Sequence, residues 1–416
     1  MSDRYQGLGL ALLVSLGVVV GGATAGMANP VQPVIAQATA DEAQQAFNEG
    51  MRLSAKQDKE SLRGAIDQFE KALKLSRQNQ NQNLQALALF SLAGIHAKLG
   101  NPQKALEHYN QALPILRGVG NRSGETATLN NIGGVYSALG KTQKALEFYN
   151  EALPIRRAVG DRSGEAITLN NIGIIYSNLG EKQKALEFYS QALPIHQAVG
   201  DRSEEATTLA NIGSVYFNLG EKQKALETYN QVLSIFRAVG NRSGEATTLN
   251  NIGLVYSALG EKQKALEFYN QALPIRRAVG DRSGEATTLN NIGLAYSNLG
   301  EKQKALEFYN QALPIDRAVG NRSGEASVLF NIAVANKSLN ELTQSLQNIN
   351  AAIAIIETLR SEFNNNALKT SYFKSVQDYY EIKIDILMRL HRQQPTQDYD
   401  AAALETADQI RARVLR

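Results

Sequence analysis

The sequence predicts an all-α solenoid, in which short helices pair and the pairs stack along the chain. The first observation is a repeat: Ala246–Glu285 is followed by a second copy, Ala286–Glu325, with only four differences. Three further forty-residue copies precede them, at Thr126–Glu165, Ala166–Glu205 and Ala206–Glu245. A period of this size indicates stacked supersecondary units and not one globular core. The second observation is a helical spacing of apolar residues within every copy.

Each copy contains two segments with this spacing. In the copy that begins at Ala246 the spaced residues are Leu249, Ile252, Gly253, Tyr256 and Leu259, then Ala265, Leu266, Phe268, Tyr269, Ala272 and Leu273. Gly260 separates the two segments. Gly280 is suited to end the second helix in a left-handed conformation, and Asp281 is suited to cap the next one. The predicted unit is helix A, a tight turn, helix B and a short loop.

The order of these residues resembles the tetratricopeptide repeat. The pattern is L-x2-I-G-x2-Y, then Ala nine residues after the Tyr, then Tyr and Ala four and seven residues beyond that. Leu249 stands where Trp is usual, and the Pro expected late in helix B lies earlier, at Pro274. The longer unit and the phrase AVGDRSGEA resemble the subtype found in Pins/LGN polarity adaptors and kinesin light chains. The resemblance implies a right-handed superhelix of about eight repeats, with helices A lining a concave groove.

The N-terminus has the features of a secretory signal peptide over residues 1–38. Arg4 precedes an apolar run, residues 7–22, and small residues follow with candidate cleavage sequences at 23–25 and 36–38. The run is short for a membrane span. The alternative is an uncleaved N-terminal anchor, and either one predicts a periplasmic or extracellular location for the repeats.

The repeats then divide the chain into segments. We expect a degenerate capping repeat at 41–80, with helices at about 41–53 and 62–77, a repeat at 84–120, five near-identical repeats at 121–326 and a degenerate repeat at 327–358. Further helices are predicted at 353–363, 368–390 and 399–416, with Pro395 interrupting the pattern before the last.

Residues 359–416 resemble the helical joint that precedes the CHAT domain, a caspase-like module of many bacterial, often cyanobacterial, proteins. Peptidases of that family use a His and a Cys. Neither the CHAT domain nor any cysteine occurs in these 416 residues. The resemblance therefore implies a recognition arm without its catalytic domain.

Composition argues against several function classes. The net charge of +3 comes from interspersed Lys, Arg and Glu, which gives little support for nucleic-acid binding. The absence of cysteine excludes disulfides, thiolate metal sites and cysteine catalysis. Four scattered histidines have no metal-ligand spacing, and no nucleotide-binding or hydrolase motif is present. We therefore expect no enzyme activity, no metal and no cofactor. His96, which replaces a core Tyr, is expected to be packed.

The candidate binding residues are two rows of asparagines on helix A. Asparagine is an unfavourable residue in a helix interior, so its recurrence needs a cause. Row one is Asn130, Asn170, Asn250 and Asn290, with Ala210 interrupting it, and row two is Asn131, Asn171, Asn211, Asn251, Asn291 and Asn331. In peptide-binding tetratricopeptide proteins the row-two position contacts the ligand backbone or its terminal carboxylate, so the resemblance implies peptide contacts here. The alternative is that these amides only bond neighbouring helices. We favour ligand contact for row two.

Specificity is expected from helix-A positions that vary between copies. They are Gly134, Ile174, Ser214, Leu254 and Leu294, together with Ser137, Ser177, Phe217, Ser257 and Ser297. Phe217, Leu254 and Leu294 would make part of the groove apolar.

Arginines recur near the start of helix A in every copy. They are Arg122, Arg162, Arg202, Arg242, Arg282 and Arg322. An anion-binding row is one interpretation. We favour exposed arginines that pair with the Glu three residues on. Arg156, Arg157, Arg276 and Arg277, near the end of helix B, are expected to offset the helix dipole.

The sequence as a whole predicts a scaffold that binds a peptide or protein. The rival hypothesis is a substrate-recognition or regulatory arm of a CHAT peptidase. A third is self-assembly through stacked repeat ends, and the sequence specifies no oligomeric state.

Overall fold

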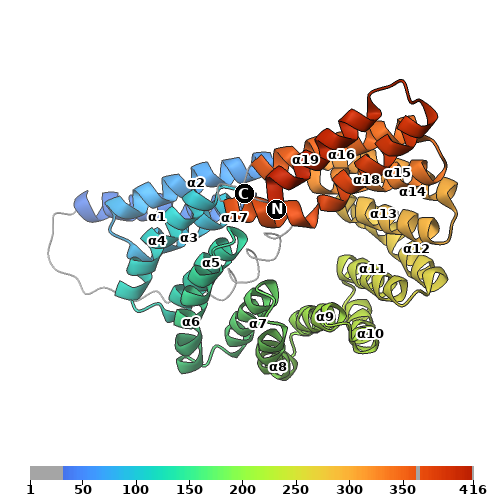
Figure 1. The fold of residues 1–416 in the computed structure, drawn as a ribbon. Helices are drawn as coiled ribbons and strands as arrows, with labels where there is room; N and C mark the ends of the chain where they lie inside the picture. The colour runs from blue at the N-terminus through green and yellow to red at the C-terminus, as the bar shows by residue number, and fades with distance from the viewer. Residues whose placement is uncertain (1–30, 362–365, 415–416) are drawn as a thin grey trace. The chain divides into compact units, whose positions relative to one another are not determined.

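The computed structural model describes residues 31–361 and 366–414, and within these residues the secondary structure is entirely helical. The chain divides into two compact units, residues 1–211 and 212–416, and the division falls inside one helix, α9. Consecutive helices pair as the repeat predicted, α1 with α2 through α7 with α8 in the first unit and α11 with α12 through α15 with α16 in the second (Figure 1). The prediction of an all-α solenoid is confirmed.

The first unit contains four helix pairs and the first part of α9. Its helices are α1 (Val31–Ser54), α2 (Lys59–Gln78), α3 (Gln82–Lys98), α4 (Pro102–Gly118), α5 (Arg122–Ala138), α6 (Thr142–Ala158), α7 (Arg162–Asn178), α8 (Lys182–Val199) and α9 (Arg202–Asn218).

The second unit contains the remainder of α9, the helix α10, three further pairs and three C-terminal helices. These are α10 (Lys222–Ala238), α11 (Arg242–Ala258), α12 (Lys262–Val279), α13 (Arg282–Asn298), α14 (Lys302–Val319), α15 (Arg322–Ser338), α16 (Leu342–Ser361), α17 (Asn366–Ser375), α18 (Gln377–Gln393) and α19 (Tyr399–Val414).

Helices A and B of one repeat pack closely because small residues lie between them. Ala265 and Ala272 of α12 are completely buried, and Tyr269 packs against Gly253 of α11. A Cβ added to Gly253 would lie 2.5 Å from the Tyr269 ring. Glycine is therefore required wherever this Tyr meets the facing helix at such close range.

Local chain signals end and restart the helices as expected. Gly280 ends α12 with a positive φ of 73°, a conformation that favours glycine. Asp281 then accepts a hydrogen bond from the Gly284 amide at 2.8 Å and caps α13. The four-residue phrase V-G-D-R is thus the junction between one repeat and the next.

The C-terminal helices form an apolar cluster with α15 and α16, but their boundaries differ from the prediction. The prediction of a single helix at 368–390 is wrong, because the helix is interrupted at Val376, between α17 and α18. Val376 has φ −126° and ψ 13° and is buried in the cluster with Phe373 and Tyr379, so apolar packing on both sides overrides a continuous helix.

The N-terminal helix α1 begins at Val31, ten residues before the predicted start at Asp41. The candidate cleavage sequence at 36–38 therefore lies within α1, whereas Arg4, the apolar run and the sequence at 23–25 lie outside the described residues. None of the helices in the described part of the chain is long and apolar enough to cross a membrane.

Candidate ligand-binding site

Row-one asparagines lie between neighbouring helices A, and most of them are buried. Asn130, Asn170 and Asn250 are 2 to 5% exposed, and Asn290 is half-buried. A buried amide requires hydrogen-bond partners, and each of these four residues has one.

The partner comes from row two of the next repeat, so the two rows form a ladder of side-chain hydrogen bonds. In each rung the row-two Nδ2 donates to the row-one Oδ1 of the preceding repeat. The rungs are Asn171 to Asn130 (3.2 Å), Asn211 to Asn170 (3.1 Å), Asn291 to Asn250 (3.0 Å) and Asn331 to Asn290 (2.8 Å). The ladder accounts for why asparagine recurs at two adjacent helical positions. The row-two asparagine of a repeat donates to the preceding repeat, and its row-one asparagine accepts from the following repeat.

The ladder has two gaps, and each follows a position where row one is not asparagine. Phe90 precedes Asn131, and Ala210 precedes Asn251. Asn131 is buried and bonds the Tyr109 hydroxyl instead. Asn251 is half-exposed and has no hydrogen bond from its amide to any described residue. Within row two, Asn251 is therefore the side chain with both its donor and its acceptor available to a ligand.

Apolar side chains lie beside Asn251. Leu254, one turn along α11, and Leu294, at the same position of α13, are each 36% exposed. Phe217 is half-buried and packs on the cluster that contains Leu249 and Ile252 of α11. The positions expected to be apolar are thus at least partly accessible.

The arginines at the start of helix A pair with the glutamate three residues on, as favoured. Arg122 Nη1 donates to Glu125 Oε2 at 2.7 Å, and the same pair recurs at the following five junctions. These arginine side chains are 52 to 58% exposed, whereas the glutamates are 3 to 6% exposed.

At five of the six junctions a second arginine bonds the other oxygen of the buried glutamate, a contact that the sequence analysis missed. Arg117 Nε donates to Glu125 Oε1 at 2.9 Å across the junction, eight residues earlier in the chain. Arg157, Arg237, Arg277 and Arg317 do the same at 2.8 to 2.9 Å. The fixed spacing of eight residues was the available signal. At one junction, Gln197 replaces this arginine and donates to Glu205 at 3.1 Å.

Arg156 and Arg276 are buried, and the prediction that they only offset a helix dipole was incomplete. Arg156 is completely buried, and its Nη1 lies 3.6 Å from Asp161 Oδ2. Burial lowers the pKa of Arg156, and Asp161 opposes that shift. Arg276 pairs with Asp281 in the same way. Both guanidinium groups lie against a glycine in the first turn of the next helix A, Gly164 in α7 and Gly284 in α13.

The equivalent position in α8 is His196, which is also completely buried. Neither ring nitrogen has a hydrogen-bond partner. Burial lowers the pKa of His196, while Asp201 and Glu205 raise it by a smaller amount. Glu204 replaces the glycine here, and burial together with Asp201 raises its pKa. His196 therefore faces two carboxylates, those of Asp201 in the loop and Glu205 of α9.

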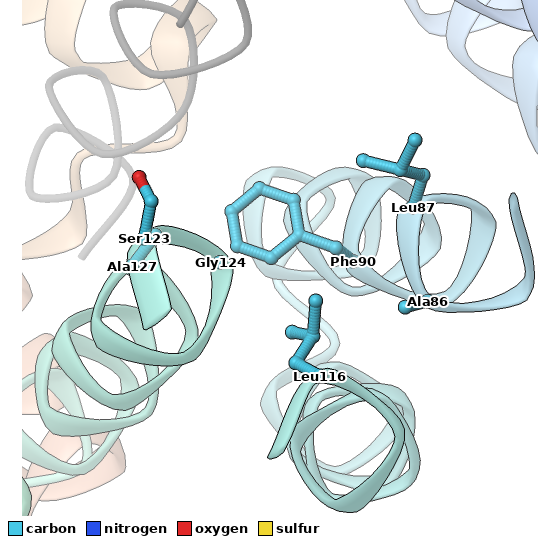
Figure 2. Close-up of a pocket in the computed structure, with 7 residues that line it drawn as sticks. All are labelled: Ala86, Leu87, Phe90, Leu116, Ser123, Gly124 and Ala127. Atoms are coloured by element: carbon cyan, nitrogen blue, oxygen red, sulfur yellow. The ribbon is translucent and has the colours of Figure 1, made fainter. Parts of the chain in front are cut away.

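Two small clefts lie among the first repeats of unit 1. One, of about 10 Å³, is bounded by α3, α4 and α5, and Figure 2 shows Phe90 and Leu116 pointing into it opposite Gly124. Its lining is almost wholly apolar. It lies at the first gap of the ladder, because Phe90 occupies the row-one position.

The second cleft, of about 40 Å³, is lined by residues of α1 to α5, among them Ser91, Lys98 and Asn131. Ser91 is buried and its hydroxyl has no hydrogen-bond partner. Lys98 Nζ donates to Gln57 at 2.9 Å, and burial lowers the pKa of Lys98. The cleft has room for little more than one water molecule.

His96 is buried, as expected, and its ring stacks on His108 with centroids 5.4 Å apart. The pair replaces the Tyr–Phe stack of most other repeats, such as Tyr256 on Phe268. Among residues 31–361 and 366–414, no three His, Asp or Glu side chains are placed to hold a metal ion.

Several solved structures have a similar fold. The apo form of the quorum sensor NprR from B. thuringiensis is 19% identical, with a TM-score of 0.60 over 75% of this chain and 87% of that one. The apo form of RapI is 19% identical, with a TM-score of 0.56 over 67% and 99% of the two chains. A Rap protein complexed with competence and sporulation factor is 15% identical, with a TM-score of 0.55 over 89% and 99%. No curated protein sequence matches the chain.

The family model of the tetratricopeptide repeat matches the chain over residues 53–118, 125–198, 204–278, 275–318 and 284–358. These ranges include most of the helix pairs whose A–B packing and junctions are described above. With more than half of its length matched, the chain belongs to the tetratricopeptide repeat family.

Proposed function

We propose that this protein is a non-catalytic scaffold that binds an extended peptide or protein segment along its helices A. The observation that carries the proposal is Asn251, a helix-A amide with no protein partner in the described structure, beside exposed Leu254 and half-buried Phe217. An amide supplies both a donor and an acceptor, which matches the hydrogen-bonding groups of an extended backbone.

The ladder refines which asparagines serve the ligand. Asn171, Asn211, Asn291 and Asn331 use an Nδ2 proton on the preceding repeat, so they offer chiefly their Oδ1. They would support the ligand from rigid positions, whereas Asn251 can pair with both groups of one peptide unit. One of the structures with a similar fold is a Rap protein complexed with competence and sporulation factor, which supports a ligand-holding role for such an array.

The test is affinity capture from periplasmic and membrane extracts with the full chain, its Asn251→Ala variant and a matched control, Asn270→Ala. Asn270 is an exposed asparagine on helix B of the same repeat. We expect a partner that is retained by the wild type and by Asn270→Ala and is reduced at least tenfold by Asn251→Ala, with unchanged circular dichroism. A partner retained equally by all three proteins would place the binding surface away from helices A.

We also propose that the scaffold acts outside the cytoplasm, on the basis of the apolar run at residues 7–22 after Arg4. A C-terminal alkaline phosphatase fusion should be active in cells and should lose activity when residues 7–22 are deleted. Activity that is unchanged by the deletion would contradict export by this segment.

The alternative function is a recognition arm for a CHAT peptidase. It is supported by the resemblance of the sequence of residues 359–416 to the helical segment that precedes the CHAT domain. Genomic sequence beyond the Arg416 codon tests it: an open frame with His and Cys motifs would favour it, and a stop codon would favour the independent scaffold.

A further inference from the structure

In unit 2, each helix A presents a stripe of uncharged side chains on one face. On α11 the stripe runs along one helical face, with successive residues four, three and four positions apart, and on α13 and α15 it repeats at the equivalent positions. We call these residues the neutral face: Thr247, Asn251, Leu254 and Ala258, then Thr287, Asn291, Leu294 and Asn298, then Ser327, Asn331, Val334 and Ser338. Most of them are exposed or half-exposed, and none carries an ionisable group.

The neutrality extends beyond the stripe. From Ala246 to Ala258 of α11 no Asp, Glu, Lys or Arg occurs, and the same holds from Ala286 to Asn298 of α13. On α15 the one such residue that follows Ala326 is Lys337, which pairs with Asp385 at 2.8 Å and is 15% exposed. On α11 and α13 the charge is confined to the first turn, where it belongs to the arginine–glutamate junctions.

The charges of each repeat lie instead on helix B. In α12 they include Lys264 and Glu267, both exposed, and Arg277, which is 51% exposed. A surface repeat with random placement would carry charge on both helices, because roughly a quarter of residues are charged in globular proteins. Beyond its first turn, helix A is therefore neutral, and the nearest charges are lysines of helix B, such as Lys264, whose Nζ lies 5.3 Å from the Tyr256 ring centroid.

The three stripes are held side by side. Asn291 of α13 donates to Asn250 of α11, and Asn331 of α15 donates to Asn290 of α13. These rungs fix the register of the aliphatic residues Leu254, Leu294 and Val334, which occupy the same position on each helix. The neutral face is consequently one continuous surface with amide and hydroxyl groups beside an aliphatic row.

Such a surface discriminates by charge. Along the middle of the face, at Asn251, Leu254 and Leu294, an ionised side chain would lose hydration without meeting a counter-charge, which is costly. The nearest cations, Lys222 and Lys262, lie at the end of the face, where they bond the Ala258 and Asn298 carbonyls. A neutral backbone loses less, because asparagine, threonine and serine groups replace water as hydrogen-bond partners. Aliphatic ligand side chains gain by covering Leu254 and Leu294.

We infer that the ligand of unit 2 is an extended, uncharged peptide segment with aliphatic side chains. The inference rests on the proposed scaffold function and names the chemistry of its ligand. Because attraction between charges contributes little at this face, binding should depend weakly on salt.

The test uses an array of twelve-residue peptides that carry zero, two or four charges of either sign, probed with the full chain. The best binders are then measured by fluorescence polarisation at 50 and 500 mM NaCl. We expect uncharged, aliphatic-containing peptides to bind best, a change in Kd below about twofold between the two salts, and a loss of at least tenfold when two central residues become Asp or Lys.

A charge introduced on the face provides the second arm. Leu254→Lys should redirect preference towards acidic peptides, whereas the matched control Asn270→Lys on helix B should not. Acidic or basic peptides that bind wild type best and weaken strongly with salt would overturn the ligand class, while a loss with Asn251→Ala would still support the scaffold. Absence of all peptide binding would also overturn the ligand class, and the scaffold itself would fail only if extract capture were negative too.

Discussion

Each repeat junction buries a glutamate between two partners, and replacing that glutamate with glutamine should reveal how much the pairing stabilises the array. At the α12–α13 junction, Glu285 accepts from Arg277 at 2.8 Å and from Arg282, and its side chain is 5% exposed. At the α8–α9 junction, Glu205 accepts from Arg202 at 2.5 Å and from the neutral Gln197 at 3.1 Å. The partners of the two glutamates differ by one guanidinium, and the α8–α9 junction also has His196 and Glu204 where the other has Arg276 and Gly284.

The structure sets the expected magnitudes. A hydrogen bond to a charged group contributes about 1.5–3 kcal/mol when it is buried, and an exposed ion pair contributes about 0–1 kcal/mol. Arg277 and Arg282 are 51% and 56% exposed, so solvent screening reduces each bond to about 1 kcal/mol. Glu285→Gln should therefore cost about 2 kcal/mol. Glu205→Gln should cost about 1 kcal/mol or less, because an amide can still bond Gln197.

The assay must report local stability, because a repeat array does not unfold in two states. Native-state hydrogen exchange of α12–α13 and of α8–α9 measures the two junctions separately. A difference of about 1 kcal/mol corresponds to a roughly fivefold difference in exchange rate. Glu267→Gln, an exposed glutamate of α12, serves as the control and should leave exchange unchanged. Equal losses at the two junctions would refute the argument that the second guanidinium stabilises.

Three further predictions concern other contacts. Asn291→Ala should lower the local stability of α11–α13 by about 1–2 kcal/mol, seen as faster hydrogen exchange, because it removes a buried rung of the ladder. Asn251→Ala should lower that stability by under about 0.5 kcal/mol. Equal effects of the two substitutions would contradict the ladder. Gly253→Ala should destabilise by about 1–3 kcal/mol, since its Cβ would lie 2.5 Å from the Tyr269 ring, and an unchanged urea midpoint would contradict that close packing. The pKa of His196 is lowered by burial, so the folded chain binds fewer protons there than the unfolded chain. Its contribution to stability should be full above about pH 6.5 and be lost as the pH falls through that value. His196→Leu should remove this dependence in hydrogen exchange of α8–α9, and a pH profile unchanged by the substitution would assign the dependence to other groups.

The helix pairs could be predicted because their signals are local. The spacing of Leu249, Ile252 and Tyr256 defines a helical face, and Gly280 with Asp281 marks the junction without any knowledge of the partner helix. The break at Val376 could not be predicted in this way. It depends on which apolar side chains of other helices surround that residue, and this is information that periodicity does not contain.

The candidate site was predicted only in part, for a similar reason. The sequence identifies the asparagine rows, but it does not show which amides are bonded: Asn291 donates to Asn250, whereas Asn251 has no side-chain partner among the described residues. An identical residue can therefore be a ladder rung in one repeat and an open amide in the next. The burial of Arg156 was missed because its sequence position, near a helix C-terminus, equally suits a solvated cation.

The differences between near-identical repeats follow the electrostatics of the junction. The late helix-B residue is buried at every junction, and the residue five positions later caps the next helix. The pairs are Leu116 with Asn121, Arg156 with Asp161, His196 with Asp201, Phe236 with Asn241, Arg276 with Asp281 and Asp316 with Asn321. Asn and Asp cap helices about equally well, so capping alone does not explain the choice.

Charge compensation does explain it. Aspartate accompanies the buried residues that are or can become cationic, where it supplies the counter-charge that a buried cation requires. Asparagine accompanies the apolar residues and Asp316, whose carboxylate accepts from Asn321 Nδ2 at 2.7 Å and would be repelled by a second carboxylate. Two of the four differences between the copies at 246–285 and 286–325 are Arg276 against Asp316 and Asp281 against Asn321. They amount to one correlated exchange, which preserves the junction and leaves the neutral face of helix A free to vary independently.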